Sequence, residues 1–102
     1  MLIKAGVDIS RLKRKIRKTL CIVDKIHQKY GIELVITSTY DGNHSACSYH
    51  YANDAYDVRW RPHYGKDIYK EIKKALGDDF DVVLEKDHIH IEYDPKPKGS
   101  KE

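Results

Sequence analysis

The sequence predicts a single α+β domain in which a small antiparallel sheet has helices packed on one face. Two segments, residues 9–30 and 66–76, carry apolar residues at the three-to-four spacing of an amphipathic helix. Two others, residues 80–84 and 88–93, are rich in β-branched and aromatic residues and are separated by a short turn, as in a hairpin. A chain of 102 residues has room for one core, so we expect one domain over residues 1–94.

The first predicted helix covers residues 9–30. Its apolar positions are Ile9, Leu12, Ile16, Leu20, Val23, Ile26 and Tyr30. Asp8 or Ser10 is a suitable cap at its start, and Gly31 stands where a helix commonly ends. His27 also lies on this helix, and we expect it at the surface or at the boundary of the core.

The middle of the chain alternates between strand and helix signals. Residues 32–38 are β-branched and predict a strand, and residues 39–49 contain a turn-rich loop. Residues 51–58 alternate loosely and predict a second strand, which carries Asp57. A shorter helix follows over residues 66–76 and is stopped by Gly77.

The predicted hairpin at the end of the domain separates polar from apolar side chains. Because successive side chains of a strand point to opposite faces, residues 88–93 divide into two sets. His88, His90 and Glu92 share one face, whereas Ile89, Ile91 and Tyr93 share the other. Residues 95–102 are polar and contain two prolines, so we expect a disordered tail.

Charge and hydropathy limit the possible partners. The net charge is only +3, but six basic residues lie between Arg11 and Lys18, which indicates a solvated helix face or a contact with an anionic polymer. No segment is long and apolar enough to span a membrane, and the first ten residues lack the apolar segment of a signal peptide. The sequence therefore does not determine the cellular compartment of the protein; residence in the cytoplasm before release to a cell wall is one possibility.

Residues 44–58 hold the most informative group of polar side chains. His50 and Asp57 are good zinc ligands, and a third could come from His88 or His90 if the two segments meet. Three protein ligands leave one position of zinc open for water, as in catalytic sites. The sequence thus predicts a site for one zinc ion on the face of the sheet opposite the helices, and a small zinc hydrolase.

The same residues resemble a known family. Residues 48–57, SYHYANDAYD, are similar to the signature SxHxxGxAxD of zinc D-alanyl-D-alanine carboxypeptidases and dipeptidases, whose family includes L-alanyl-D-glutamate endolysins. Together with His88-Ile89-His90, the run from His44 is also similar to the zinc-bearing signalling domain of hedgehog proteins, which shares this fold.

This resemblance assigns roles to single residues. It implies that His50, Asp57 and His90 are the zinc ligands. An acid three positions before the last ligand acts as general base in these peptidases, which implies Asp87, while the hedgehog-like arrangement points to Glu85.

Three further residues are candidates for supporting roles. His88, which shares a face with His90, could stabilise the charged tetrahedral species. His44 is a candidate donor to the substrate. Ser48 is a candidate for substrate binding or for capping or bracing its loop, rather than for nucleophilic catalysis.

Two positions depart from the family pattern. Asn53 replaces a glycine of the signature, although asparagine tolerates the left-handed conformation comparatively well. Asp41 stands where many of these peptidases carry an arginine for the oxyanion or the substrate carboxylate; Arg59, Arg61 or a histidine could substitute for it.

The expected function is zinc-dependent hydrolysis of peptidoglycan stem peptides by a monomer, as in a carboxypeptidase or an endolysin-like peptidase of phage or prophage origin. Two alternatives remain. The chain could be a catalytically silent zinc-containing binding module of the same fold, or a basic domain that binds nucleic acid, the less favoured partner.

Overall fold

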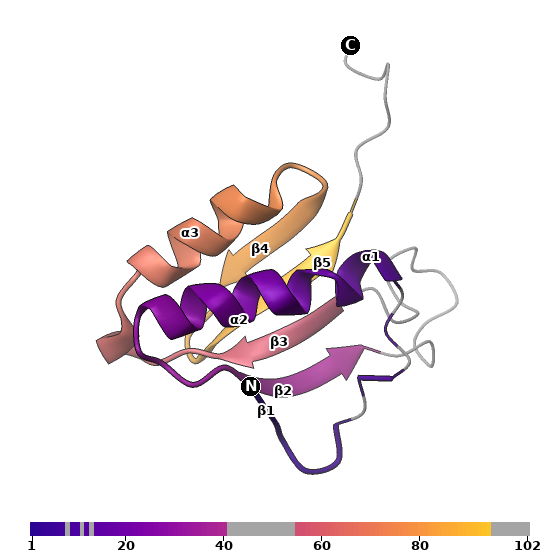
Figure 1. Ribbon diagram of the computed structural model, residues 1–102, viewed down its shortest axis with the longest axis horizontal. Coiled ribbons are helices and arrows are strands. Elements are labelled where there is room, and N and C mark those ends of the chain that lie inside the picture. Colours follow the sequence, from indigo (N-terminus) through magenta and orange to yellow (C-terminus); the bar gives the residue numbers. More distant parts are fainter. Residues whose placement is uncertain (8, 11, 13, 41–54, 95–102) are drawn as a thin grey trace.

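A five-stranded sheet forms the centre of the protein (Figure 1). The computed structural model describes residues 1–7, 9, 10, 12, 14–40 and 55–94. The strands are β1 (Leu2–Ile3), β2 (Val35–Tyr40), β3 (Ala55–Arg59), β4 (Phe80–Leu84) and β5 (His88–Tyr93). Their order across the sheet is β1-β2-β3-β5-β4, so β3 and β5, the two strands with candidate site residues, are direct neighbours.

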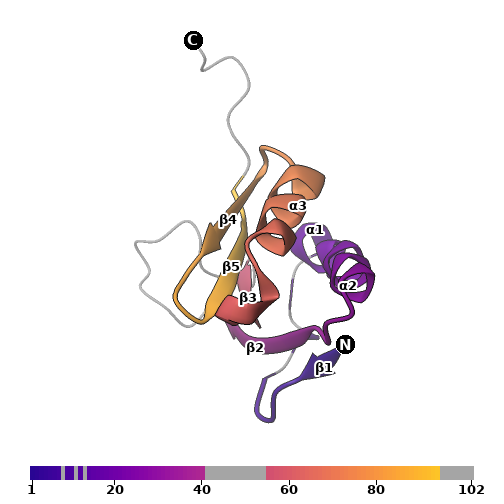
Figure 2. The ribbon, with the colours of Figure 1, turned by 90° about the vertical axis from the view of Figure 1, so that its left-hand side faces the viewer.

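The helices cover one face of this sheet, as predicted. They are α1 (Arg14–Arg17), α2 (Thr19–Lys29) and α3 (Asp67–Leu76), with a short 3-10 helix, η1 (Pro62–Tyr64), before α3. Seen along the sheet, all three α-helices lie on the same side (Figure 2). The predicted first helix begins later than expected, at Arg14, so Ser10 does not cap it, and Asp8 lies outside the described residues. The segment also divides into two helices, α1 and α2, at Lys18, where one helix was predicted, and α2 ends at Lys29, two residues before Gly31, as predicted.

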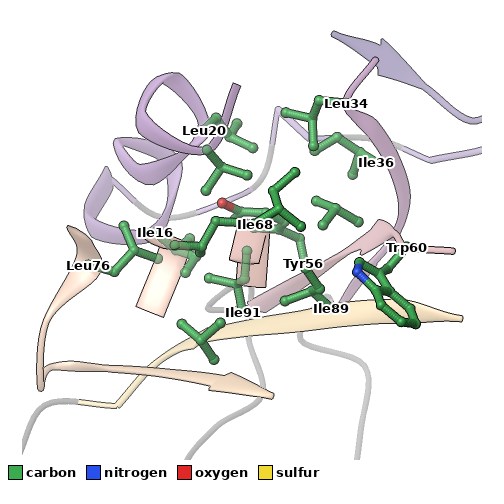
Figure 3. Close-up of a cluster of buried hydrophobic side chains, with 14 of the residues drawn as sticks. Ile16, Leu20, Leu34, Ile36, Tyr56, Trp60, Ile68, Leu76, Ile89 and Ile91 are labelled. Atoms are coloured by element: carbon green, nitrogen blue, oxygen red, sulfur yellow. The ribbon is translucent and has the colours of Figure 1, made fainter. Parts of the chain in front are cut away.

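The core lies between the helices and the sheet, which explains why apolar and polar side chains alternate along the strands. Tyr56 and Val58 of β3 and Ile89 and Ile91 of β5 are fully buried against the helices. Figure 3 shows Tyr56 among isoleucines and leucines from both layers. Its hydroxyl lies 2.5 Å from the Thr19 hydroxyl, which satisfies both groups in the core. Because these residues point to the core, their neighbours along β3 and β5 point to the opposite face.

The sheet is mixed, which corrects the prediction of a wholly antiparallel sheet. β1 pairs with β2 in parallel, with Leu2 opposite Val35 and Ile3 opposite Ile36. The backbone N–H of Leu2 donates to Leu34 and that of Lys4 donates to Ile36, at 2.7 and 2.9 Å. Two residues are too few to show an alternation in sequence, so no pattern predicted this strand.

The predicted hairpin of residues 80–84 and 88–93 is confirmed with the same bounds, and the predicted helix of residues 66–76 begins one residue later. The first central strand begins at Val35 rather than at residue 32. Of the second predicted strand, residues 51–54 lie outside the described residues, and the described part, β3, runs from Ala55 to Arg59. The predicted loop of residues 39–49 lies largely outside the described residues, as does the predicted tail of residues 95–102. No described helix has the length and apolar content required to cross a membrane.

His27 is fully buried, so the expectation of a surface or boundary histidine was wrong. Its Nδ1 lies 2.9 Å from the carbonyl oxygen of Val23, one turn earlier in α2, which makes Nδ1 the protonated nitrogen. Nε2 has no hydrogen-bond partner among the described residues. Burial lowers the pKa of His27 below its usual value, because the charged ring would lose its hydration.

We expect His27 to make the protein less stable in mild acid. The folded-state pKa lies below that of the unfolded chain, about 6.5. As the pH falls below about 6.5, the unfolded chain gains a proton that the folded chain does not, and the free energy of unfolding decreases by up to about 1.4 kcal/mol per pH unit. Urea unfolding at pH 7.5 and 5.5 checks this. The His27→Gln variant should lose less stability than the wild type between the two values; an equal loss would rule the effect out.

Candidate metal site

The pairing of β3 with β5 brings two of the predicted zinc ligands together. Asp57 is directly opposite His90 in the antiparallel register, and Arg59 is opposite His88. In an antiparallel pair such residues have adjacent side chains on the same face. Since Tyr56 and Ile91 occupy the core face, Asp57 and His90 lie on the face without helices. Residues 33 positions apart in the chain are therefore neighbours in the fold.

Asp57 is the centre of this polar group. Its Oδ1 lies 2.9 Å from His90 Nδ1, and its Oδ2 lies 3.8 Å from His88 Nε2. The Asp57 side chain is only 10% exposed, whereas those of His90 and His88 are 20% and 32% exposed. A carboxylate that is almost buried needs a cationic partner or several hydrogen bonds to remain ionised. The two imidazoles supply such partners, and they leave the group open to solvent on the histidine side.

Glu92 completes the surroundings of His90. Its Oε1 lies 3.0 Å from His90 Nε2, so each ring nitrogen of His90 faces a carboxylate. In the neutral ring, an N–H at Nε2 that donates to Glu92 would leave the lone pair of Nδ1 for a metal ion and would fix the orientation of the ring. Sequence reasoning put Glu92 on the correct face but gave it no role. Its position two residues after the candidate ligand His90, on the same strand, is the feature of the sequence that could have identified this role.

The two carboxylates change the acidity of the histidine between them. Hydrogen bonding to Asp57 raises the pKa of His90 to about 9, and the bond to Glu92 acts in the same direction. The ring is therefore protonated at neutral pH when no metal is bound. The proton on Nδ1 occupies the position beside Asp57 that a metal ion would take. The proton and a metal ion therefore compete for Nδ1.

The turn between β4 and β5 presents the two candidate bases. Asp87 Oδ1 lies 2.8 Å from His88 Nδ1, and this hydrogen bond lowers the pKa of the Asp87 carboxyl below its usual value. Asp87 is thus linked through the His88 ring to Asp57. Glu85 closes the turn through its backbone N–H, which donates to the His88 carbonyl at 2.8 Å. Its exposed side chain contacts none of these groups within the described parts of the chain.

The remaining predicted site residues lie outside the described residues. They are the predicted zinc ligand His50 and the candidate substrate contacts His44 and Ser48. Asp41 and Asn53, the two departures from the family pattern, lie there as well. In residues 1–40 and 55–94, as far as they are described, no three His, Cys, Asp or Glu side chains are arranged to hold a metal ion. The fold therefore unites Asp57, His90, His88 and Asp87, while the third predicted ligand stays a prediction.

Comparisons with known proteins identify the family of the chain. Residues 2–92 match the family described as peptidase M15. No curated protein and no solved structure matches the chain significantly. The match includes every strand and helix described above, with the exception of the last residue of β5. The chain therefore belongs to the peptidase M15 family.

Proposed function

We propose that the protein hydrolyses peptide bonds in peptidoglycan stem peptides and that His50, Asp57 and His90 hold one zinc ion for this reaction. Membership of the peptidase M15 family implies a metallopeptidase of the peptidoglycan type, and members are typically zinc-dependent. The observation that carries the proposal is the contact between Asp57 Oδ1 and His90 Nδ1 at 2.9 Å on the face of the sheet without helices.

The donor atoms of this pair fit zinc in type and in spacing. A carboxylate oxygen and an imidazole nitrogen are both common zinc ligands. Two ligands at about 2.0–2.1 Å from a tetrahedral ion stand about 3.3 Å apart, so Asp57 and His90 need to separate by only a few tenths of an ångström. Glu92 orients the ring from the other side, as carboxylates commonly do for metal-bound histidines.

Zinc in such a site activates a water molecule and polarises the scissile carbonyl. The chain itself must accept and return a proton. We assign this role to Asp87, a carboxylate whose contact with His88 at 2.8 Å holds it beside the candidate metal site. Glu85 is the alternative base. The His88 ring, between Asp87 and Asp57, is suited to stabilise negative charge on the substrate oxygen.

The experiment that tests the proposal is a cleavage assay on purified peptidoglycan and on synthetic stem peptides, with mass-spectrometric detection of the products. We expect cleavage that a chelator abolishes and that added zinc restores. Stoichiometric zinc without cleavage would instead identify a silent binding module of the same fold. Salt-sensitive binding of DNA, with no cleavage and no zinc, would favour a nucleic-acid-binding domain that uses the basic residues near α1.

Replacing Glu92 by glutamine should weaken zinc binding without removing a ligand. The substitution keeps the size of the side chain but removes the charge that faces His90 Nε2 at 3.0 Å. Loss of such a supporting contact lowers metal affinity by about 10- to 100-fold. Chelator competition measures this affinity, and Asp78→Asn, in the exposed turn before β4, is a control for charge. Equal affinities of wild type and Glu92→Gln would contradict the role assigned to Glu92.

The raised pKa of His90 predicts an unusual pH dependence of zinc binding. Below about pH 9 a proton must leave His90 before the metal binds, so zinc affinity should rise about tenfold per pH unit up to that value. A histidine with an ordinary pKa would already be neutral near pH 7, so its deprotonation would not raise zinc affinity further above that pH. Zinc competition titrations between pH 7 and 9 separate the two cases, and a constant affinity over this range would contradict the prediction.

A further inference from the structure

A hollow on the helical side of the protein is lined mainly by cations. Its volume is about 470 Å³, and its lining residues are Leu12, Arg14, Arg17, Lys18 and Cys21. We call it the α1 hollow. The three cations are exposed and stand three and four residues apart, which brings their side chains together on one side of a helical turn. Leu12 is almost fully buried and gives the hollow an apolar floor.

The positive charge of the α1 hollow is not neutralised by its surroundings. Residues 9–23 contain no aspartate or glutamate. The side chains of Arg14 and Lys18 form no hydrogen bond or ion pair with the described residues. Arg17 donates from Nη2 to the Ser10 carbonyl at 2.5 Å, which holds its guanidinium group in the hollow. Like charges in one depression repel each other, so a bound anion would stabilise this arrangement.

The α1 hollow and the candidate metal site lie on opposite sides of the sheet. The hollow is formed by α1, by α2 and by residues next to them, and these helices cover one face of the sheet (Figure 2). Asp57 and His90 lie on the other face, because Tyr56 and Ile91 occupy the core. A ligand in the hollow would therefore leave the candidate metal site free, so both sites could be occupied at the same time.

The lining of the α1 hollow favours a flexible polymer of phosphodiesters. Arginine matches a phosphate group with paired hydrogen bonds, and the carbon chain between two phosphates can contact the apolar floor. Double-stranded DNA usually needs a larger surface, since specific protein–DNA interfaces bury about 1,000–2,500 Å² of protein. Three cations in a single depression fit a thin polymer better than they fit a rigid duplex.

We infer that the α1 hollow binds an anionic cell-wall polymer made of polyol phosphate units. Such a contact holds the protein on the wall while the opposite face of the sheet stays free for a peptide. The inference rests on the proposed function, because that function places the protein at the cell wall.

Three phosphate contacts give a salt dependence that can be measured. On a flexible polyanion each neutralised phosphate contributes about 0.7 to the slope of log affinity against log salt concentration. The three cations of the α1 hollow therefore predict a slope of about −2, which is a loss of roughly 20-fold between about 50 and 200 mM salt.

Fluorescence anisotropy of a labelled glycerol phosphate oligomer, titrated with the full chain, tests the inference without any need for turnover. In the double variant with Arg14→Gln and Lys18→Gln, we expect binding at low salt to fall about tenfold or more and the slope to drop to about −0.7. The matched control combines Lys70→Gln with Lys74→Gln, which removes two charges at the same spacing from exposed positions of α3 and should bind like the wild type. Both variants keep Arg17 and its contact with Ser10, so circular dichroism should show the wild-type fold.

Three results would overturn the inference. Equal losses in the two double variants would show attraction by net charge rather than binding in the hollow. Duplex DNA that competes as well as the oligomer, at equal phosphate concentration, would indicate a nucleic-acid-binding surface. Polyglutamate that competes equally well would show that phosphate is not recognised, and both competition tests use the wild-type chain, so they hold even if a variant fails to fold.

The outcome is separate from the fate of the proposed function. A chain that cleaves stem peptides but does not bind the oligomer loses only this inference. A chain that binds the oligomer through the α1 hollow but cleaves nothing loses only the peptidase proposal.

Discussion

Asp57→Asn should abolish zinc binding and, with it, peptide hydrolysis. The substitution preserves the size of the side chain but replaces the negatively charged carboxylate of the proposed ligand by an amide. Loss of a supporting contact already costs about 10- to 100-fold in metal affinity, so loss of a ligand should cost more than about 100-fold. Zinc content after dialysis and chelator competition provide the measurement, and hydrolysis of a stem peptide should fall below detection.

The Asp57→Asn variant should remain folded, which separates this effect from a loss of structure. The new amide would keep a polar group at an almost buried position, and the core residues on either side, Tyr56 and Val58, are unchanged. Circular dichroism and thermal unfolding test this directly. Full zinc occupancy in a folded Asp57→Asn protein would show that the metal binds elsewhere.

Asp87→Asn should reduce the turnover number by about 10²- to 10⁴-fold while zinc stays bound. This is the range commonly attributed to a single general acid or base. The carboxylate is exposed, so its replacement should change neither folding nor metal affinity much. Steady-state kinetics and zinc content, measured on the same preparation, distinguish a lost base from a lost metal.

Two matched variants sharpen this result. Asp78→Asn removes the same charge from an exposed turn at the other end of β4 and should leave the turnover number unchanged. Glu85→Gln tests the alternative base in the same turn as Asp87. If Glu85→Gln were the variant that lost activity and Asp87→Asn retained it, the assignment of the base would have to be reversed.

Much of the site follows from the periodicity of one strand. The alternation in residues 88–93 predicted that His88, His90 and Glu92 share a face, and the hairpin has the predicted bounds. That Asp57 joins them depends on the register between β3 and β5, which is a tertiary feature. No local pattern fixes such a register; the resemblance to zinc peptidases implied only that Asp57 and His90 lie close together.

The features that the sequence did not predict correctly, β1 and the burial of His27, also have physical explanations. β1 is held by two residues and a few backbone hydrogen bonds, too short a segment to carry a pattern. His27 was expected near the surface because histidine is polar. The hydrogen bond from its Nδ1 to the Val23 carbonyl satisfies one nitrogen within α2 and makes burial of the neutral ring tolerable.

The central claim is that side chains from distant segments converge on a single zinc ion. Anomalous scattering at the zinc absorption edge, from crystals of the zinc-loaded protein, measures this directly. The account predicts one ion at about 2.0–2.2 Å from donor atoms of His50, Asp57 and His90. An ion bound by other residues, or a refined structure in which these three side chains lie too far apart to share one ion, would contradict it.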